Sequence, residues 1–249
     1  MYKIFTKKFI QYALKWLAKV YLWRYKPYVV IVAGATNRHW VKEEIVKALK
    51  EKGLDSRASR KNFNAEIGLP LSILDLPSGE GNFKNWLKIM RQGIKKITNY
   101  NLSGQELQIT NYLILETAIS HPEDMDYLLS IVKPQAAVLT TIATVYRENF
   151  EDLDEVALEY QKLVKILPKG GLLLLNYDDE RIRNLSRFSP CRTITYGLND
   201  GADYQAKNVK KVVDGQEFEI NSVPIKINRF GKHHIYAKIT AYAIRSEKF

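Results

Sequence analysis

The sequence predicts an α/β fold, with a mainly parallel sheet flanked by helices and a small antiparallel subsheet near the C-terminus. Short, wholly apolar runs recur along the chain, each followed by a turn and a segment of helical period. Alternating polar and apolar residues become common only beyond Gly197. With 249 residues, of which 46% are hydrophobic, the chain is long enough to bury a sizeable core.

Residues 1–26 form a basic segment without any acidic residue. Spacings of three and four predict an amphipathic helix with most apolar groups on one broad face and Lys8, Lys15, Lys19 and Lys26 opposite. The uncharged runs are too short to span a bilayer, and no signal-peptide cleavage site follows. Such a helix could lie on an anionic membrane surface, or pack on its own domain or a second subunit. Its apolar groups are Phe5, Phe9, Ile10, Leu14, Trp16, Leu17, Val20, Tyr21 and Trp23.

The first unit of the sheet follows Pro27. Residues 28–33 are apolar and mostly β-branched, which predicts a buried parallel strand ended by Gly34. Residues 41–52 then form a helix stopped by Gly53.

Further units of the same kind follow along the chain. We expect buried strands at residues 112–115, 136–140 and 172–175, a short strand at 192–196, and helices at 125–132 and 153–167. A basic amphipathic surface helix lies within residues 79–104. Small antiparallel strands are expected at 209–213, 217–220 and 223–227, before a final helix from Ile235.

The composition narrows the classes of partner. A net charge of +11 could attract nucleic acid, an anionic membrane or phosphorylated ligands, or could reflect lysine-rich helix faces. Nucleic acid is disfavoured, because the charge concentrates on amphipathic helices and no nucleic-acid module is recognisable. A single cysteine, Cys191, excludes an intramolecular disulfide and fits a reducing compartment.

In open parallel sheets, ligands bind at the carboxyl ends of the strands. That rule places the candidate functional residues in four segments: 34–40, 116–121, 140–146 and 176–179. The first of these loops has the position of a phosphate-binding loop, so we expect a P-loop-type sheet. Such a loop needs a second glycine, a lysine and a hydroxyl, but these places hold Asn37, Arg38 and His39. The alternative that Arg38 and His39 bind an anion at the helix N-terminus remains open.

Five segments in order resemble Mur ligases, and within that family the members that add D-alanyl-D-alanine. Residues 62–71 (Asn-Phe-Asn-Ala-Glu-Ile-Gly-Leu-Pro-Leu) are the most similar. The other four are residues 115–125, 140–148, 175–179 and 231–234. The resemblance implies that residues 27–249 are the family's central domain, with the N-terminal UDP-sugar domain and the C-terminal ligase domain absent.

The resemblance also implies an ATP-dependent ligase, which activates a carboxylate as an acyl phosphate for attack by an amine. ATP and Mg²⁺ would be the cofactors. Glu116 would hold magnesium, although it could also be a solvated strand end, and Asn64 and Glu66 would lie on the substrate side. The nucleotide-binding residues would be Gly34, Thr36, Asn37, Arg38, His39, Asn176, Asp179 and His233. For His233 and His234, we expect a structural or surface pair rather than a metal site.

The residues that depart from the family pattern are those expected near the magnesium ion and the γ-phosphate of ATP. Arg38 replaces the loop lysine and His39 the hydroxyl, Tyr146 replaces a metal-binding histidine, and Tyr160 replaces a carbamylated lysine. Lys162 is close in sequence, but it would lie on a different face of the helix from Tyr160.

From these departures we expect no catalytic residue and predict an inactive binding or scaffolding homologue linked to peptidoglycan precursor synthesis. The alternative is a diverged ATP-dependent ligase or ATPase completed by a partner chain. Expected partners are a second copy, a Mur-type protein, or an anionic membrane through residues 1–26. The expected location is cytoplasmic, at the inner membrane face.

Overall fold

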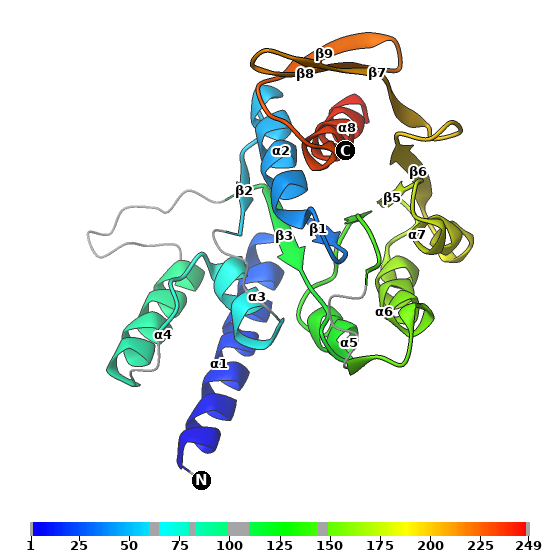
Figure 1. The fold of residues 1–249 in the computed structure, drawn as a ribbon. Coiled ribbons are helices and arrows are strands. Elements are labelled where there is room, and N and C mark those ends of the chain that lie inside the picture. Colours follow the sequence, from blue (N-terminus) through cyan, green and yellow to red (C-terminus); the bar gives the residue numbers. More distant parts are fainter. Residues whose placement is uncertain (1, 60–64, 80–82, 99–109, 144–148, 248–249) are drawn as a thin grey trace.

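The computed structural model describes residues 2–59, 65–79, 83–98, 110–143 and 149–247. Within them the strands form one sheet in the order β2-β3-β1-β4-β5-β6-β7-β8-β9, parallel from β2 to β7 and antiparallel thereafter (Figure 1). The α/β prediction is therefore confirmed. The strands are β1 Tyr28–Ala33, β2 Ser56–Ala58, β3 Tyr112–Thr117, β4 Ala136–Leu139, β5 Leu172–Asn176, β6 Arg192–Gly197, β7 Tyr204–Val212, β8 Gly215–Ile220 and β9 Val223–Ile227.

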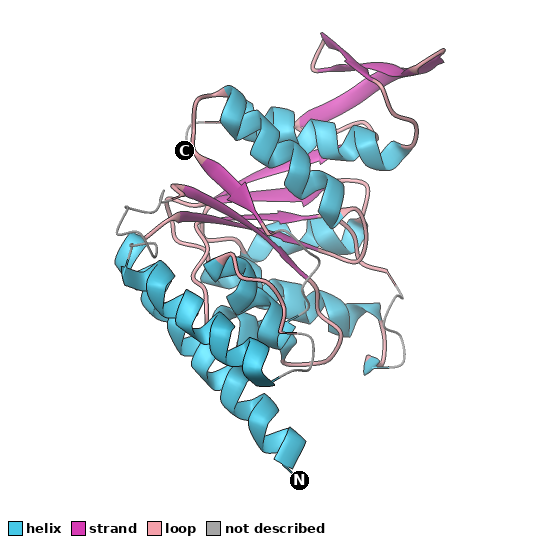
Figure 2. Cartoon of the chain, turned by 90° about the vertical axis from the view of Figure 1, so that its left-hand side faces the viewer, coloured by secondary structure: helices cyan, strands magenta, loops and turns pink. Residues whose placement is uncertain are grey.

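Helices cover both faces of the sheet, as predicted (Figure 2). Helices α2 and α8 pack together on one face, and α1, α3, α5 and α6 lie on the other. Helix α4 packs beside α1. The helices are α1 Tyr2–Tyr25, α2 Arg38–Glu51, α3 Ala65–Leu74, α4 Phe83–Thr98, α5 Asp124–Leu129, α6 Leu153–Ile166, α7 Glu180–Asn184 and α8 Lys232–Ser246.

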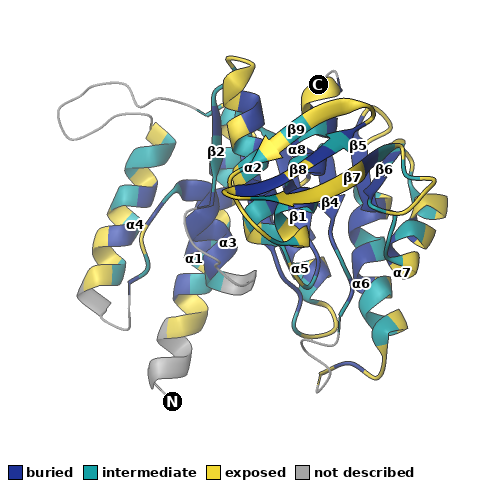
Figure 3. Cartoon of the chain, turned by 45° about the horizontal axis from the view of Figure 1, so that its top comes forward, coloured by how far each residue is buried: buried dark blue, intermediate teal, exposed yellow. Residues whose placement is uncertain are grey.

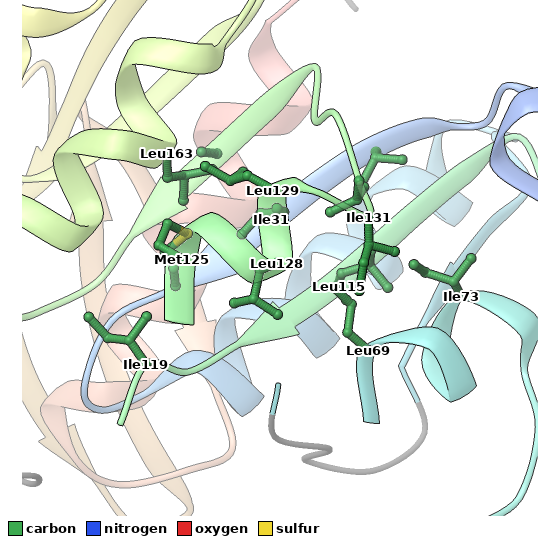
Figure 4. Close-up of a cluster of buried hydrophobic side chains, with 14 of the residues drawn as sticks. Ile31, Leu69, Ile73, Leu115, Ile119, Met125, Leu128, Leu129, Ile131 and Leu163 are labelled. Atoms are coloured by element: carbon green, nitrogen blue, oxygen red, sulfur yellow. The ribbon is translucent and has the colours of Figure 1, made fainter. Parts of the chain in front are cut away.

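The parallel strands are apolar throughout because both of their faces are buried. In β1, Val30 and Val32 point into the α2–α8 core, whereas Ile31 points into the opposite core. That second core is continuous: Ile31 and Leu115 of the sheet lie beside α3 and α5 in Figure 4. Burial is densest in the central strands and falls toward the β8–β9 edge (Figure 3).

Several boundaries differ from the sequence prediction. Strand β2 and helices α3 and α7 were not predicted, and α2 begins at Arg38, three residues earlier than expected. Strand β2 is three residues long and partly polar, so it carries no hydrophobic period. Helix α3 is almost wholly apolar and contains Pro70, which hides its helical period.

Helix α1 buries only part of the broad apolar face that the sequence predicts. Ile10, Leu14 and Leu17 are buried, but Trp16 and Trp23 are exposed on the other side, close to the lysines. The nine apolar groups expected to share a face span about half of the helix circumference at 3.6 residues per turn. Only the edge of that arc with Ile10, Leu14, Leu17 and Tyr21 is buried. The helix packs on its own domain, where Lys15 Nζ donates to Ser130 Oγ at 2.7 Å.

Candidate functional site at the carboxyl edge of the sheet

The carboxyl ends of β1, β3 and β4 meet at one edge of the sheet. Ala33 is in register with Thr117 on one side and with Leu139 on the other. Because the strands are parallel, the loops that follow them leave in the same direction. The loop of residues 34–37 therefore lies between Glu116 and Thr140, as the sequence predicts.

The loop after β1 is held by hydrogen bonds to the loop after β4. Gly34 has φ +135°, and a Cβ there would overlap the Thr140 hydroxyl. That hydroxyl donates to Thr36 O at 2.7 Å, and Ala35 N–H donates to Thr141 O at 2.7 Å. The Ala35 amide is therefore already bonded and is not presented to a ligand.

Arg38 turns inward, into the loop that precedes it. Its Nη1 donates to Ala35 O at 2.8 Å and also to Gly34 O, while its Nε lies 3.3 Å from Oε1 of Glu116. A loop that cradles phosphate presents N–H groups to the anion, but here two loop carbonyls face a guanidinium. His39, the next residue, is exposed beside Trp40.

Lys42 is a functional-site residue that sequence reasoning missed. It is fully buried, and its Nζ lies 3.1 Å from Glu116 Oε2 and donates to Ser59 O at 2.9 Å. Residues four apart share a helix face, so the spacing from Arg38 was a usable signal. Glu116 is itself buried, so the alternative of a solvated strand end is wrong.

These contacts do not fit a magnesium site. Mg²⁺ prefers near-octahedral oxygen coordination, yet both oxygens of Glu116 are taken by cationic donors. A divalent ion placed there would face two positive charges at close range. Among the described residues, no group of three His, Cys, Asp or Glu side chains could hold a metal ion.

Asn176 ends β5 and Asp179 follows it, at the same edge of the sheet, and both side chains hydrogen-bond to the chain itself. Asn176 is buried; its Nδ2 donates to Thr140 O at 2.7 Å and its Oδ1 accepts from Asp178 N–H at 3.1 Å. Asp179 caps α7 through Ile182 N–H and accepts from Ile142 N–H at 2.7 Å. Both side chains therefore fasten the loops that follow β4 and β5.

His233 reaches the loop through its backbone. Asn37, with φ 68°, donates from Nδ2 to His233 O at 3.0 Å. The His233 and His234 rings lie 4.1 Å apart by their centroids, and His234 meets Trp40 edge-on at 4.5 Å. Burial, together with the nearby charges of His233 and Arg229, lowers the pKa of His234. The pair forms part of an aromatic cluster, which agrees with its structural interpretation.

Tyr160 is buried and lines a cavity of about 380 Å³ that also touches Gly34 and Ala35. Much of the wall is apolar, including Ile119, Phe150, Leu153 and Val156. Lys162 pairs instead with Asp126 and Glu159, at 2.6 and 2.5 Å, as expected for another helix face.

Three predicted positions are not placed at the site. Asn64 and Tyr146 lie outside the described residues, as does the side chain of Glu66, whose backbone belongs to α3. The structure thus brings together Gly34, Thr36, Asn37, Arg38, Glu116 and the backbone of His233, with Asn176 and Asp179 on the neighbouring loop.

The fold and this edge define an open parallel α/β domain whose ligand edge lies at the carboxyl ends of β1, β3, β4 and β5. Residues 93–244, more than half of the chain, match the model of the Mur ligase middle domain. The chain therefore belongs to the Mur ligase family.

Individual relatives agree with this assignment. The chain is 26% identical over 235 residues to the UDP-N-acetylmuramoyl-tripeptide–D-alanyl-D-alanine ligase of Bacillus subtilis (strain 168), covering 93% of this chain and 44% of that protein. It is 29% identical over 157 residues to the UDP-N-acetylmuramate–L-alanine ligase of Clostridium botulinum (strain Hall), covering 57% and 33%. MurF ligase from Thermotoga maritima in complex with ADP shares the fold with a TM-score of 0.73 and 21% identity, over 95% of this chain and 49% of that one.

Proposed function

We propose that this chain is a catalytically inactive Mur-ligase-like domain that acts as a binding or scaffolding module in the synthesis of peptidoglycan precursors. One observation carries the proposal: Glu116, the carboxylate that the family resemblance assigns to magnesium, is neutralised by Arg38 and Lys42. The link to cell-wall precursors is supported by the relatives' names, which describe ligases of UDP-N-acetylmuramoyl compounds.

The surroundings of Glu116 support the same proposal. The loop directs its Gly34 and Ala35 carbonyls at a guanidinium, so the phosphate of a nucleotide would meet acceptors rather than donors. Catalysis of acyl phosphate formation depends on positively charged groups or metal ions arranged around the transferring phosphoryl group. In this chain, the two cations nearest to Glu116 are committed to internal contacts.

The chain spans 44% of the length of the D-alanyl-D-alanine ligases that it matches in Bacillus subtilis and Haemophilus influenzae. We further propose a cytoplasmic location, where such precursors are handled, with peripheral contact to the inner membrane face.

The test is release of inorganic phosphate from millimolar ATP with magnesium. The B. subtilis ligase, with its substrates, serves as the positive control and a Glu116→Gln variant of this chain as the negative one. We expect the wild-type chain to match the Glu116→Gln variant and the protein-free blank. Magnesium-dependent release that is lost in Glu116→Gln would overturn the proposal in favour of a diverged ATPase or ligase.

A further inference from the structure

We propose that helices α1 and α4 form a peripheral binding face for anionic phospholipid bilayers. None of the residues involved belongs to the carboxyl edge of the sheet, so this inference stands independently of the lost nucleotide site. It deepens the peripheral membrane contact proposed above, because a second helix far along the chain packs beside α1 and carries exposed apolar and basic groups of its own.

One side of helix α1 is buried against the domain, and the other side is exposed. One side is buried in the core and includes Ile10, Leu14 and Tyr21. The other side exposes four large aromatic residues at helical spacing. These are Phe9, Tyr12, Trp16 and Trp23, which are 67%, 72%, 58% and 75% exposed. A row of exposed aromatic groups marks an interaction surface.

Basic residues flank this aromatic row. Lys8, Lys19 and Lys26 are exposed and follow the same spacing, one to four positions from the nearest aromatic group. No acidic residue occurs in α1. Tryptophan and tyrosine favour the level of the lipid headgroups, and lysine can keep its charge at that level while its stem lies along apolar groups.

Helix α4 lies beside α1 and adds further exposed apolar and basic groups. It is fastened to α1 where Tyr25 Oη donates to Ile97 O at 2.7 Å, and the two helices lie side by side (Figures 1 and 2). Leu87 and Ile94 are 51% and 53% exposed, and exposed Lys88 and Arg91 lie near them. Like α1, α4 contains no acidic residue in its sequence.

An anionic bilayer fits this face better than a second copy of the chain. In a two-fold dimer, each patch meets its own equivalent, so two acid-free basic surfaces would repel each other. A bilayer offers negative headgroups above an apolar layer, which complements both the lysines and the aromatic row. Within the described residues no helix is long and apolar enough to cross a membrane, so the proposed contact is superficial.

Vesicle co-sedimentation of the full chain tests the inference. We expect binding to vesicles of phosphatidylcholine with about one-third phosphatidylglycerol, at least about tenfold weaker binding to pure phosphatidylcholine, and loss of binding at high salt. The variant Lys8→Gln/Lys19→Gln/Lys26→Gln should bind the anionic vesicles at least about tenfold more weakly.

A matched control removes three charges elsewhere. The variant Lys210→Gln/Lys211→Gln/Lys232→Gln changes exposed lysines on β7 and α8, and should bind like the wild type. The variant Phe9→Ser/Trp16→Ser/Trp23→Ser should also lose binding; circular dichroism and thermal melting confirm that each variant is folded. Equal losses in the control and test charge variants would overturn the inference. So would absence of sedimentation at low salt, or concentration-dependent dimerisation that the serine variant abolishes.

Discussion

Lys42 Nζ lies 3.1 Å from Oε2 of Glu116 in the interior of the domain, with 1% and 5% of the two side chains exposed. The pair places a fixed positive charge against the carboxylate that the family resemblance assigns to a metal. A buried ion pair of this kind is sensitive to removal of one partner. Without Lys42, Glu116 would keep Arg38 at Oε1 but lose the cation at Oε2.

The variant Lys42→Met should therefore lower the free energy of unfolding by about 2–3 kcal/mol, because a buried carboxylate oxygen loses its charged donor while Arg38 remains, as measured by urea denaturation. Lys238→Met is the matched control, because Lys238 pairs with Glu44 at 3.3 Å with about a quarter of its side chain exposed. We expect less than about 1 kcal/mol there. Equal losses in the two variants would show that Glu116 does not depend on Lys42.

Gly34→Ala tests the conformation of the loop. At φ +135°, an added methyl would be strained and would overlap the Thr140 hydroxyl, so we expect a loss of stability of about 1–3 kcal/mol or more. Gly170→Ala is the control, because no atom lies within 4 Å of a Cβ at that position. Its effect should stay within about 0.5 kcal/mol, and a Gly34 variant as stable as this control would contradict the loop geometry.

The variant Tyr236→Phe tests the hydrogen bond to Asp178, a residue that binds the loop after β6. Tyr236 Oη donates to Asp178 Oδ2 at 2.6 Å, and burial, with Asp178 beside it, raises the pKa of Tyr236. Loss of a hydrogen bond to a charged acceptor should reduce the free energy of unfolding by about 1.5–3 kcal/mol. Tyr12→Phe, at an exposed position, should have almost no effect on the urea midpoint, and comparable shifts in both variants would argue against the Asp178 contact.

The pH dependence of stability should include a contribution from His234. Its pKa is lowered from the ordinary histidine value of 6.5, first by burial and then by His233 and Arg229. The unfolded chain then binds the proton more readily than the folded one, so stability is fully present above pH 6.5 and falls as the pH drops toward the folded-state pKa. Urea midpoints between pH 8 and pH 5 should fall less steeply in His234→Asn; identical slopes would contradict this assignment.

The parallel core was predictable because buried strands carry an unbroken apolar signature, as in β1 and β5. The short edge strand β2 was not, because Arg57 and Ser56 interrupt that signature. Family motifs correctly placed Gly34, Arg38 and Glu116 at one edge. They did not reveal Lys42, since a lysine on a helix is ordinarily solvated, and only the tertiary fold turns it toward Glu116.

The same limit applies to α1. Its period predicted a helix, but the arc on which it docks depends on the neighbouring helices and cannot be read from its own residues. Trp16 and Trp23 could therefore be assigned to an apolar face, but not to its exposed side.

Calorimetric titration of the wild-type chain with ATP, in magnesium and in excess chelator, tests the central claim most directly. Because Arg38 and Lys42 already neutralise Glu116, we predict no magnesium-dependent binding heat up to millimolar ATP. Saturable binding that requires magnesium and disappears in Glu116→Gln would contradict the claim, since it would show that the carboxylate is free to hold a metal–nucleotide complex.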